Sequence, residues 1–364
     1  MKDKVLIIVG SNSVHSIRYL TAVYQNFEQT VFITNNTHNL NLPTSIITYC
    51  INFKLLNFKA RYQIANILKL YPNGIIHIHQ ANSFAYHTIK AVKLTKLKFK
   101  IILTTWGSDI LILPNRNKLM YKMVNYNISQ ADIITSDSLY MSSEIRHIYP
   151  KVKRLITLNF GIQNFESNLD LSKKEDVILS NRLHKPLYNI DKILIGFKQF
   201  INTYPKYNHY KLYIIASGSE TDKLIKLSHE LGFDNNQIKF LGMLNYNELI
   251  KYYKISKLFI SIPSSDAGSL SVAEAMSYGC YPILSNIPAN LELVINQING
   301  TIVESEHNLG NDIYQALELI NNNDKYYYIT SFNHQIIAQK YVFQTNIQDF
   351  IKLYHEEYLS STIK

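Results

Sequence analysis

Short apolar runs alternate with longer amphipathic stretches along the first half of the chain. Runs rich in Ile, Val and Thr predict β-strands at Val5–Val9, Gln29–Thr34, Gly74–His79, Lys100–Thr105, Ile133–Ser136 and Leu155–Leu158. Apolar residues at helical spacing between them predict helices at Val14–Gln25, Arg61–Tyr71, Ser83–Leu94 and Asn117–Ser129. Because strand and helix alternate, we expect parallel βαβ units and an open, doubly wound sheet.

The alternation stops once, at the polar segment Asn159–Asn168, and then restarts. Further strands are predicted at Asp176–Leu179, Tyr210–Ala216, Ile238–Leu241, Leu258–Ile262 and Tyr281–Ser285. Helices are predicted at Asp191–Thr203, Thr221–Leu231, Asn245–Tyr253 and Ser269–Tyr278, with a last one at Thr345–Leu359. Two α/β domains are therefore expected, residues 1–165 and 166–344, with residues 345–364 joining the first. Ligands of such folds bind where the carboxyl ends of the strands meet.

Composition agrees with a two-domain globular protein. The chain has 364 residues, 46% hydrophobic and 18% charged, and no apolar run approaches the about 18 residues of a membrane-spanning helix. The start, MKDKVLIIVGSNS, lacks a signal-cleavage pattern and is interpreted as a first core strand. Cys50 and Cys280 lie in apolar sequence and are too few for a disulfide framework, so a cytoplasmic protein is expected.

The net charge of +10 is divided unevenly. Up to Phe165 there are 19 Lys plus Arg and 6 Asp plus Glu, which gives +13; the remainder has 18 and 21, which gives −3. A basic first half predicts an anionic partner: nucleic acid, anionic lipid or a phosphorylated substrate. Five lysines gather in KAVKLTKLKFK, at Lys90, Lys93, Lys96, Lys98 and Lys100. They indicate either a solvated helix end or contact with anionic lipid head groups, whereas nucleic acid is disfavoured because no aromatic residues interleave with them.

The segment Ser261–Val303 carries the most specific chemistry. A strand ends at Pro263, a polar loop carries Asp266, and a helix is expected to begin near Ser269. Glu274 follows Asp266 by eight residues, or roughly 12 Å along a helix. A nucleotide sugar has hydroxyls at both ends and a diphosphate between them, which fits two carboxylates separated by a helix N-terminus. The ordinary alternative is a capping Asp and an exposed mid-helix Glu.

This segment resembles the signature of the retaining GT-B glycosyltransferases of family 4, in which an acid and a later Glu precede A-M-x-x-G-x-P-[VI]. The matching residues are Asp266, Glu274, Ala275, Met276, Gly279, Pro282 and Ile283, followed by Glu292 and Asn299-Gly300. Weaker resemblances are carried by GIIHIHQ (74–80), LTTWGSDI (103–110), SNRLHKPLYNI (180–190) and FLGMLNYNELIKYY (240–253). The resemblance implies two Rossmann-like, doubly wound domains facing a cleft, with the sugar donor on the second and the acceptor on the first.

The resemblance also implies roles for individual residues. Arg182 and Lys185 would bind the donor diphosphate, Glu274 the ribose and Asp266 the transferred sugar. Further donor-binding positions would be Gly218, Gly242, Met243, Ala267, Gly268, Ser269 and Leu270. Acceptor-side positions would be His15, Arg18, His79, Trp106 and Asp109. The catalytic candidates are Asp266, Glu274, Arg182, His15 and Asp109; taken singly, each could instead be an ordinary surface or capping residue.

Three positions depart from the family pattern. Leu187 stands where the family has a Lys five residues after Arg182, Asp266 stands where Glu is more usual, and Trp106 stands where His is common. The first loop, GSNSVHS, lacks G-x-G-x-x-G, which argues against a nicotinamide dinucleotide site. No D-x-D pair occurs and no third ligand accompanies His77 and His79, so neither a metal nor another cofactor is expected.

The sequence thus predicts a retaining hexosyl- or N-acetylhexosaminyltransferase. Its donor would be a nucleotide-diphosphate sugar, most simply a UDP-sugar, and its acceptor a glycan, glycolipid or protein in bacterial surface-glycan synthesis. The family's usual route is front-side attack, in which the departing diphosphate helps to take the acceptor proton. The basic half would associate with the inner face of the cell membrane. A nucleotide-sugar epimerase on the same fold, and a non-catalytic binding subunit suggested by Leu187 and Trp106, fit the same pattern.

Overall fold

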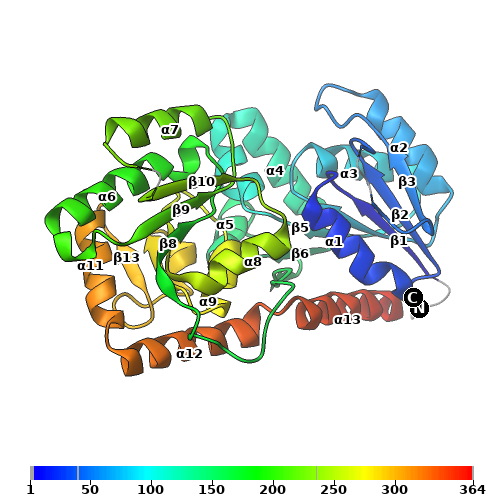
Figure 1. Ribbon diagram of the computed structural model, residues 1–364. Coiled ribbons are helices and arrows are strands. Elements are labelled where there is room, and N and C mark those ends of the chain that lie inside the picture. The colour runs from blue at the N-terminus through cyan, green and yellow to red at the C-terminus, as the bar shows by residue number, and fades with distance from the viewer. Residues whose placement is uncertain (1–3, 39–40, 235, 363–364) are drawn as a thin grey trace. The chain divides into compact units, whose positions relative to one another are not determined.

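The chain folds into two compact units, each built on a parallel sheet (Figure 1). The computed structural model describes residues 4–38, 41–234 and 236–362. The N-terminal unit comprises Met1–Phe160 and Phe343–Lys364, and the C-terminal unit comprises Gly161–Val342. The predicted boundaries at 165 and 344 lie five and two residues beyond the observed ones.

The N-terminal unit contains a seven-stranded sheet in the order β3-β2-β1-β4-β5-β6-β7, with every described pairing parallel. Its strands are β1 (Val5–Val9), β2 (Gln29–Thr34), β3 (Ile46–Cys50), β4 (Ile75–His79), β5 (Lys100–Thr104), β6 (Ile133–Ser136) and β7 (Leu155–Thr157). The sequence pattern did not predict β3. Cys50, expected in an apolar setting, ends this edge strand and is exposed, whereas Cys280 is buried.

Helices cover both faces of this sheet. They are α1 (Val14–Val23), α2 (Lys59–Lys69), α3 (Ser83–Thr95), α4 (Lys118–Gln130), α5 (Leu139–Ile148) and α13 (Phe343–Thr362). The α1 and α13 helices pack over Leu6 and Ile8, while α3 packs between α2 and α4. The Tyr19 and Tyr354 hydroxyls lie 2.6 Å apart, which ties α13 to α1. The last helix of the chain thus belongs to the N-terminal unit.

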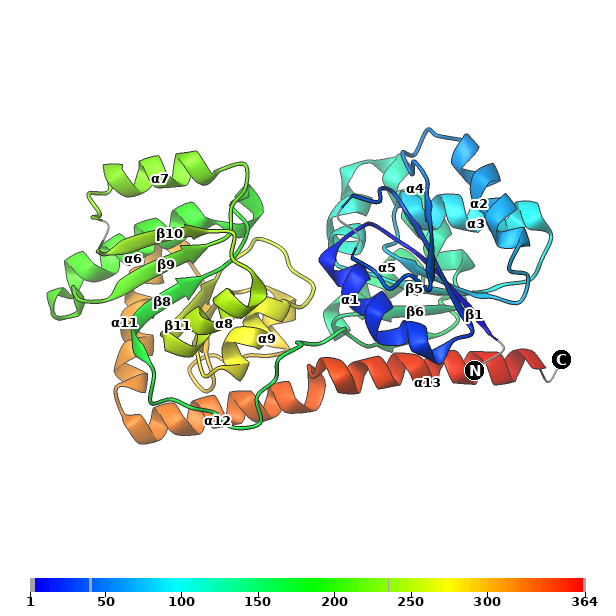
Figure 2. The ribbon, with the colours of Figure 1, turned by 45° about the vertical axis from the view of Figure 1, so that its right-hand side comes forward.

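The C-terminal unit contains a six-stranded parallel sheet in the order β10-β9-β8-β11-β12-β13 (Figure 2). Its strands are β8 (Glu175–Ser180), β9 (Lys211–Ile215), β10 (Ile238–Gly242), β11 (Ser256–Ser261), β12 (Tyr281–Ser285) and β13 (Thr301–Val303). Its helices are α6 (Ile190–Thr203), α7 (Thr221–Glu230), α8 (Tyr246–Ile255), α9 (Leu270–Ser277), α10 (Pro288–Leu291), α11 (Leu309–Ile320) and α12 (Asn323–Lys340). Residues of α6 and α11 form one core with the sheet, and residues of α8 and α9 form the other.

The strand order of the C-terminal unit reverses between the neighbouring strands β8 and β11. In open α/β sheets such a reversal leaves room for a ligand beyond the carboxyl ends of the two strands. The expectation of two doubly wound α/β domains is confirmed. Across the described ranges, none of the helices combines the length and the apolar character needed to cross a membrane.

Candidate functional site

Polar side chains gather where β8 and β11 end in the C-terminal unit. The loop after β8 carries Arg182, and the loop after β11 carries Asp266 and leads into α9. Because β8 and β11 are parallel neighbours, both loops leave the same edge of the sheet. The predicted donor residues on these two loops therefore meet at the point where the strand order reverses.

The guanidinium of Arg182 is the centre of this cluster. It donates from Nη2 to Asp266 Oδ2 at 2.7 Å, and from Nη1 to Ser271 Oγ at 2.9 Å and to the Ser269 hydroxyl. Its other side lies over the Tyr188 ring, 4.6 Å from the ring centre. The side chains of the ion pair are only 11% and 18% exposed, so solvent screens the two charges weakly.

The N-terminus of α9 lies beside this guanidinium. Ser269 occupies the N-cap position but makes no capping hydrogen bond, because its hydroxyl is engaged with Arg182 and with Ser271 Oγ at 2.9 Å. Just before it, Gly268 adopts a φ of +145° that other residues rarely adopt. Backbone N–H groups at the start of a helix and an Arg guanidinium both attract phosphate oxygens. The arrangement is suited to an anion with several oxygens.

Glu274, in the middle of α9, is buried and is held by α8. Its Oε2 accepts a hydrogen bond of 3.0 Å from the Tyr253 hydroxyl, which in turn accepts one of 2.7 Å from Asn181 Nδ2. Burial, and then the charge of Glu274, raise the pKa of Tyr253 well above its ordinary value, so its hydroxyl remains a donor. This chain connects Glu274 to the residue next to Arg182. The alternative interpretation of Glu274 as an exposed mid-helix residue is wrong, because Glu274 is only 7% exposed.

Tyr253 and Asn181 were not among the predicted site residues. Tyr253 lies in the quoted stretch FLGMLNYNELIKYY, but the sequence alone does not show which of its two final tyrosines faces α9. Asn181 immediately precedes Arg182, and its position next to a predicted diphosphate ligand was the available signal. Ser271, likewise missed, is one residue beyond Leu270 and faces the guanidinium.

At Gly218, the loop after β9 packs closely against the loop after β8 that carries Arg182. A Cβ at this position would lie 2.3 Å from the carbonyl oxygen of His184, a contact that no side chain tolerates. The loop after β9 therefore rests directly on the loop that carries Arg182. Gly242 ends β10 with a φ of +65°, and its carbonyl accepts from Ala216 N at 2.8 Å. Met243 follows it, 66% exposed.

Lys185 and Leu187 lie in the loop after β8, which continues into a short 3-10 turn at Pro186–Tyr188. Lys185 is exposed, and the carbonyl of Leu187 accepts a 2.9 Å hydrogen bond from Ser264 N. Leu187 thus joins the two site loops through its backbone.

The predicted acceptor-side residues of the N-terminal unit form an aromatic cluster. His15 lies at the start of α1, His79 ends β4, and Trp106 follows β5, with ring centres 5.8 Å apart for His15–Trp106 and 5.5 Å apart for His79–Trp106. Arg18 lies one turn after His15 on α1. Among the residues that the structure describes, the two ring nitrogens of His79 and Nε1 of Trp106 have no hydrogen-bond partner. Burial, and then the electrostatic effect of His15, lower the pKa of the His79 imidazole to about 3.

Asp109 has a different environment from the other acceptor-side candidates. Its buried carboxylate accepts hydrogen bonds from Ala81 N at 2.6 Å and from Trp106 N at 2.9 Å. Burial raises its pKa, while these backbone hydrogen bonds act in the opposite direction. Asp109 therefore fixes the loops after β4 and β5, and its contacts agree with a structural capping role.

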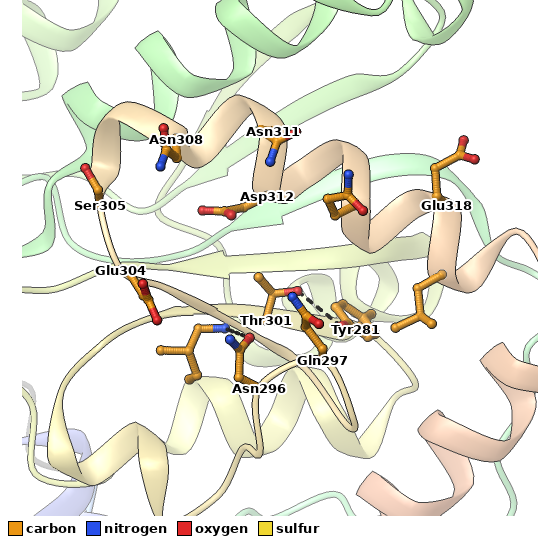
Figure 3. A pocket seen from close by; sticks show the side chains of 13 residues that line it. Tyr281, Asn296, Gln297, Thr301, Glu304, Ser305, Asn308, Asn311, Asp312 and Glu318 are labelled. Carbon is orange, nitrogen blue, oxygen red and sulfur yellow. Dashed lines mark hydrogen bonds between the residues drawn. The ribbon is translucent and has the colours of Figure 1, made fainter.

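A second, polar groove of about 550 Å³ lies in the C-terminal unit, between β13 and α11 (Figure 3). It shares no lining residue with the Arg182 cluster. Asn296 Oδ1 accepts from Ile302 N at 2.9 Å and so covers part of the sheet edge. Burial, and then the charge of Glu304, raise the pKa of Asp312 to about 6.

Within the described part of the chain, no group of three or more His, Cys, Asp or Glu side chains could hold a metal ion.

Comparison with known proteins gives one family for each unit. The family described as Glycosyl transferases group 1 matches residues 162–330, and the family described as Glycosyl transferase 4-like matches residues 4–138. The chain is 24% identical over 354 residues to an uncharacterized glycosyltransferase of Methanocaldococcus jannaschii, covering 93% of this chain and 90% of that protein. It is 25% identical over 203 residues to the alpha-monoglucosyldiacylglycerol synthase of Streptococcus pneumoniae, covering 56% of this chain but only 43% of the synthase.

Among solved structures, the fold is similar to that of Anabaena HepE in complex with UDP-glucose. The TM-score is 0.78 at 14% sequence identity, and the alignment covers 97% of this chain and 99% of HepE. The two family matches fall within the two structural units, one in each, and together they span most of the chain. The chain therefore belongs to the group 1 glycosyltransferases of GT-B fold.

Proposed function

We propose that the chain transfers a hexosyl or N-acetylhexosaminyl group from a UDP-sugar to a hydroxyl of a glycan or glycolipid, with retention of anomeric configuration. The observation that carries this proposal is the position of Arg182, between the N-terminus of α9 and Asp266, with Glu274 further along the same helix. UDP-glucose bound in the structurally similar HepE supports the choice of nucleotide.

Arg182 and the first N–H groups of α9 would bind the diphosphate. In the described structure the guanidinium is paired with Asp266. Phosphate oxygens compete for the same Nη atoms, so binding of the donor would release the Asp266 carboxylate. The released carboxylate could then accept hydrogen bonds from hydroxyls of the transferred sugar. Donor binding and the preparation of the sugar contact are thereby coupled through one guanidinium.

Glu274 would hold the ribose of the donor. A carboxylate that accepts from both hydroxyls of a ribose has to be fixed in orientation. Tyr253 and Asn181 supply that orientation by the hydrogen-bonded chain that runs from α8 to the loop after β8. The resulting distribution of roles has Arg182 on the diphosphate, Asp266 on the sugar and Glu274 on the ribose.

The chemical step would proceed by front-side attack. As the bond from the anomeric carbon to the diphosphate breaks, negative charge develops on the leaving oxygen, where Arg182 and the helix N–H groups stabilise it. The same diphosphate accepts the proton of the attacking hydroxyl, so the acceptor adds on the face that the leaving group vacates. This charge neutralisation requires no metal ion.

The acceptor would be a glycan or a lipid-linked glycan. A glycolipid is supported by the Streptococcus pneumoniae relative, whose name describes a synthase of a glucosylated diacylglycerol. His15, Arg18, His79 and Trp106 would contribute to acceptor binding from the N-terminal unit, since the rings of His15, Trp106 and His79 lie together there and Arg18 follows His15 on α1.

Titration calorimetry of the purified chain with UDP, UDP-glucose and UDP-N-acetylglucosamine, followed by a transfer assay with membrane glycolipid acceptors, tests the proposal. We expect UDP binding, loss of that binding in Arg182→Ala, and UDP release that depends on an acceptor. Conversion of the donor without an acceptor would favour an epimerase. Donor binding without hydrolysis or transfer would favour a non-catalytic subunit, and absence of nucleotide binding would refute the donor site.

A further inference from the structure

One face of the N-terminal unit carries only positive charge. The α2, α3 and α4 helices contain seven basic residues and no acidic ones: Lys59, Arg61, Lys69, Lys90, Lys93, Lys118 and Lys122. Between Glu28 and Asp132 the only acid in the sequence is Asp109, which is buried beneath the loops. The acids of α13 lie on the opposite side of the sheet (Figures 1 and 2), where Glu356 and Glu357 pair with Arg154.

Large apolar side chains are exposed on this same face. Leu56 is 80% exposed, Leu119 is 62% exposed and Phe58 is 58% exposed. They line a groove of about 380 Å³ together with the lysines Lys90 and Lys122. Apolar side chains exposed together beside charged ones mark an interaction surface, because single exposed hydrophobics are common whereas a grouped set is not.

Aromatic rings hold the cations next to this groove. The Lys90 ammonium lies 4.4 Å, and the Lys93 ammonium 5.1 Å, from the centre of the Tyr126 ring, which also lines the groove. The Arg61 guanidinium lies 5.0 Å from the Phe58 ring centre. Cation–π contact keeps these charges beside the apolar surface instead of extended into solvent. The face therefore presents fixed cations around an apolar groove.

Such a surface matches the interface of an anionic lipid bilayer, which offers phosphates and acyl chains within a few ångströms of each other. A second copy of the chain would place two faces of the same sign against each other, which is repulsive. A nucleic acid would engage the cations but leave Leu56 and Leu119 in water.

We infer that the α2–α3–α4 face docks on an anionic bilayer. Leu56, Phe58 and Leu119 enter the interfacial layer, and the lysines of α3 and α4 contact head-group phosphates. The inference goes beyond the proposed transferase reaction, because none of these residues belongs to the Arg182 cluster. Binding to membranes and sugar transfer are consequently separable.

Flotation of the full chain with vesicles tests the docking, in the absence of any donor. One set of vesicles contains phosphatidylglycerol and phosphatidylcholine, and the other contains phosphatidylcholine alone. We expect at least tenfold stronger binding to the anionic vesicles, decreasing between 0.1 and 1 M salt as the Debye length falls from about 10 Å to about 3 Å. Equal binding to both vesicles, or binding to neither, would overturn the inference.

Two variants separate the charged and the apolar contributions. The combination Lys90→Gln, Lys93→Gln and Lys122→Gln should lower binding to anionic vesicles at least tenfold. The combination Leu56→Ser, Phe58→Ser and Leu119→Ser should weaken binding several-fold and leave its salt dependence in place. Matched changes in the C-terminal unit, Lys226→Gln and Tyr328→Ser, alter an exposed cation and an exposed aromatic residue and should leave binding unchanged.

Cooperative urea unfolding followed by the fluorescence of Trp106, which belongs to the N-terminal unit, verifies that the lysine and apolar variants are folded. Vesicle binding unaffected by the lysine variant would overturn the inference even if the apolar variant failed to fold. Concentration-dependent dimers that disappear in the apolar variant, with no vesicle binding, would assign the face to a second copy of the chain.

Discussion

Arg182 Nη2 and Asp266 Oδ2 lie 2.7 Å apart, joining the loops that follow β8 and β11. Both side chains are largely buried, so each charge depends on the other. In the proposed reaction, phosphate oxygens would replace Asp266 as the partner of the guanidinium, and a sugar hydroxyl would become the partner of the carboxylate. The ion pair would then be the form of the proposed donor site before the donor binds.

Replacing Arg182 should weaken nucleotide binding, whereas replacing Asp266 should not. Arg182→Ala removes charge-assisted hydrogen bonds to the diphosphate and should weaken UDP binding by roughly 1.5–3 kcal/mol. Asp266→Asn removes the competitor for the guanidinium, so UDP affinity should stay the same or rise while sugar transfer falls. Titration calorimetry and a transfer assay measure the two effects. A loss of UDP affinity in Asp266→Asn equal to that in Arg182→Ala would contradict the exchange of partners.

Tyr253→Phe should weaken donor binding, because Tyr253 holds the carboxylate of Glu274, the proposed partner of the ribose. Its hydroxyl connects Asn181 to Glu274, so the change leaves a buried carboxylate with one donor fewer. Loss of one such hydrogen bond costs about 1 kcal/mol, equivalent to a several-fold increase in the Kd for UDP. Tyr252→Phe, at the adjacent position on α8, is the matched control and should bind as the unaltered chain does. Equal affinities in the two variants would remove the positioning role from Tyr253.

Activity should persist in excess EDTA. In the proposed reaction, Arg182 and the N-terminus of α9 would supply the positive charge that other glycosyltransferases obtain from a cation held by an acidic pair. The measurement is UDP release in the presence of acceptor, with and without EDTA, on protein freed of metal by dialysis. Complete loss of turnover that Mn²⁺ or Mg²⁺ restores would refute a donor site neutralised by protein groups alone.

Much of this architecture follows from local pattern, but not all of it. The strand β1 is buried on both faces and shows as a continuous apolar run, VLIIV. The edge strand β3 was missed although Ile46–Cys50, IITYC, is rich in β-branched and aromatic residues; its burial pattern shows one buried residue at its start and an exposed one at its end. β13 was also missed; it has only three residues, Thr301–Val303.

The site was predictable to the extent that its residues are adjacent in sequence. Asp266 and Glu274 share one loop and helix, and their spacing indicated a ligand of a definite length. Tyr253 could not be paired with Glu274 in the same way, because their contact depends on how α8 packs against α9. For Asp109 the sequence left two roles open, and only the distances to Ala81 N and Trp106 N distinguish them.

Gly218→Ala should destabilise the C-terminal unit and weaken donor binding together. The new Cβ would lie 2.3 Å from His184 O, so the loop carrying Arg182 must move. Overpacking of this kind costs typically 1–3 kcal/mol. Gly232→Ala, at a φ of +71° beyond the end of α7, is a control that strains the backbone away from the site. Chemical denaturation should show destabilisation in both variants, and calorimetry a loss of UDP affinity only in Gly218→Ala. Unchanged UDP affinity in that variant would show that the two loops are not coupled.

His79 should make the stability of the N-terminal unit fall in mild acid. Burial lowers its pKa from 6.5 to about 3 in the folded chain, so between these values the unfolded chain binds a proton that the folded chain does not. The free energy of unfolding therefore decreases as the pH falls below 6.5, by about 2 kcal/mol between pH 7.5 and pH 5 for this one group. His79→Phe should remove that part of the pH dependence.

Urea unfolding followed by the fluorescence of Trp106, the single tryptophan of the chain, reports on this unit because the indole lies beside His79. His38→Phe, at an exposed histidine of the same unit, should keep the full pH dependence. If His79→Phe lost stability between pH 7.5 and pH 5 as steeply as the unaltered chain, His79 would not be the buried neutral group that its environment requires.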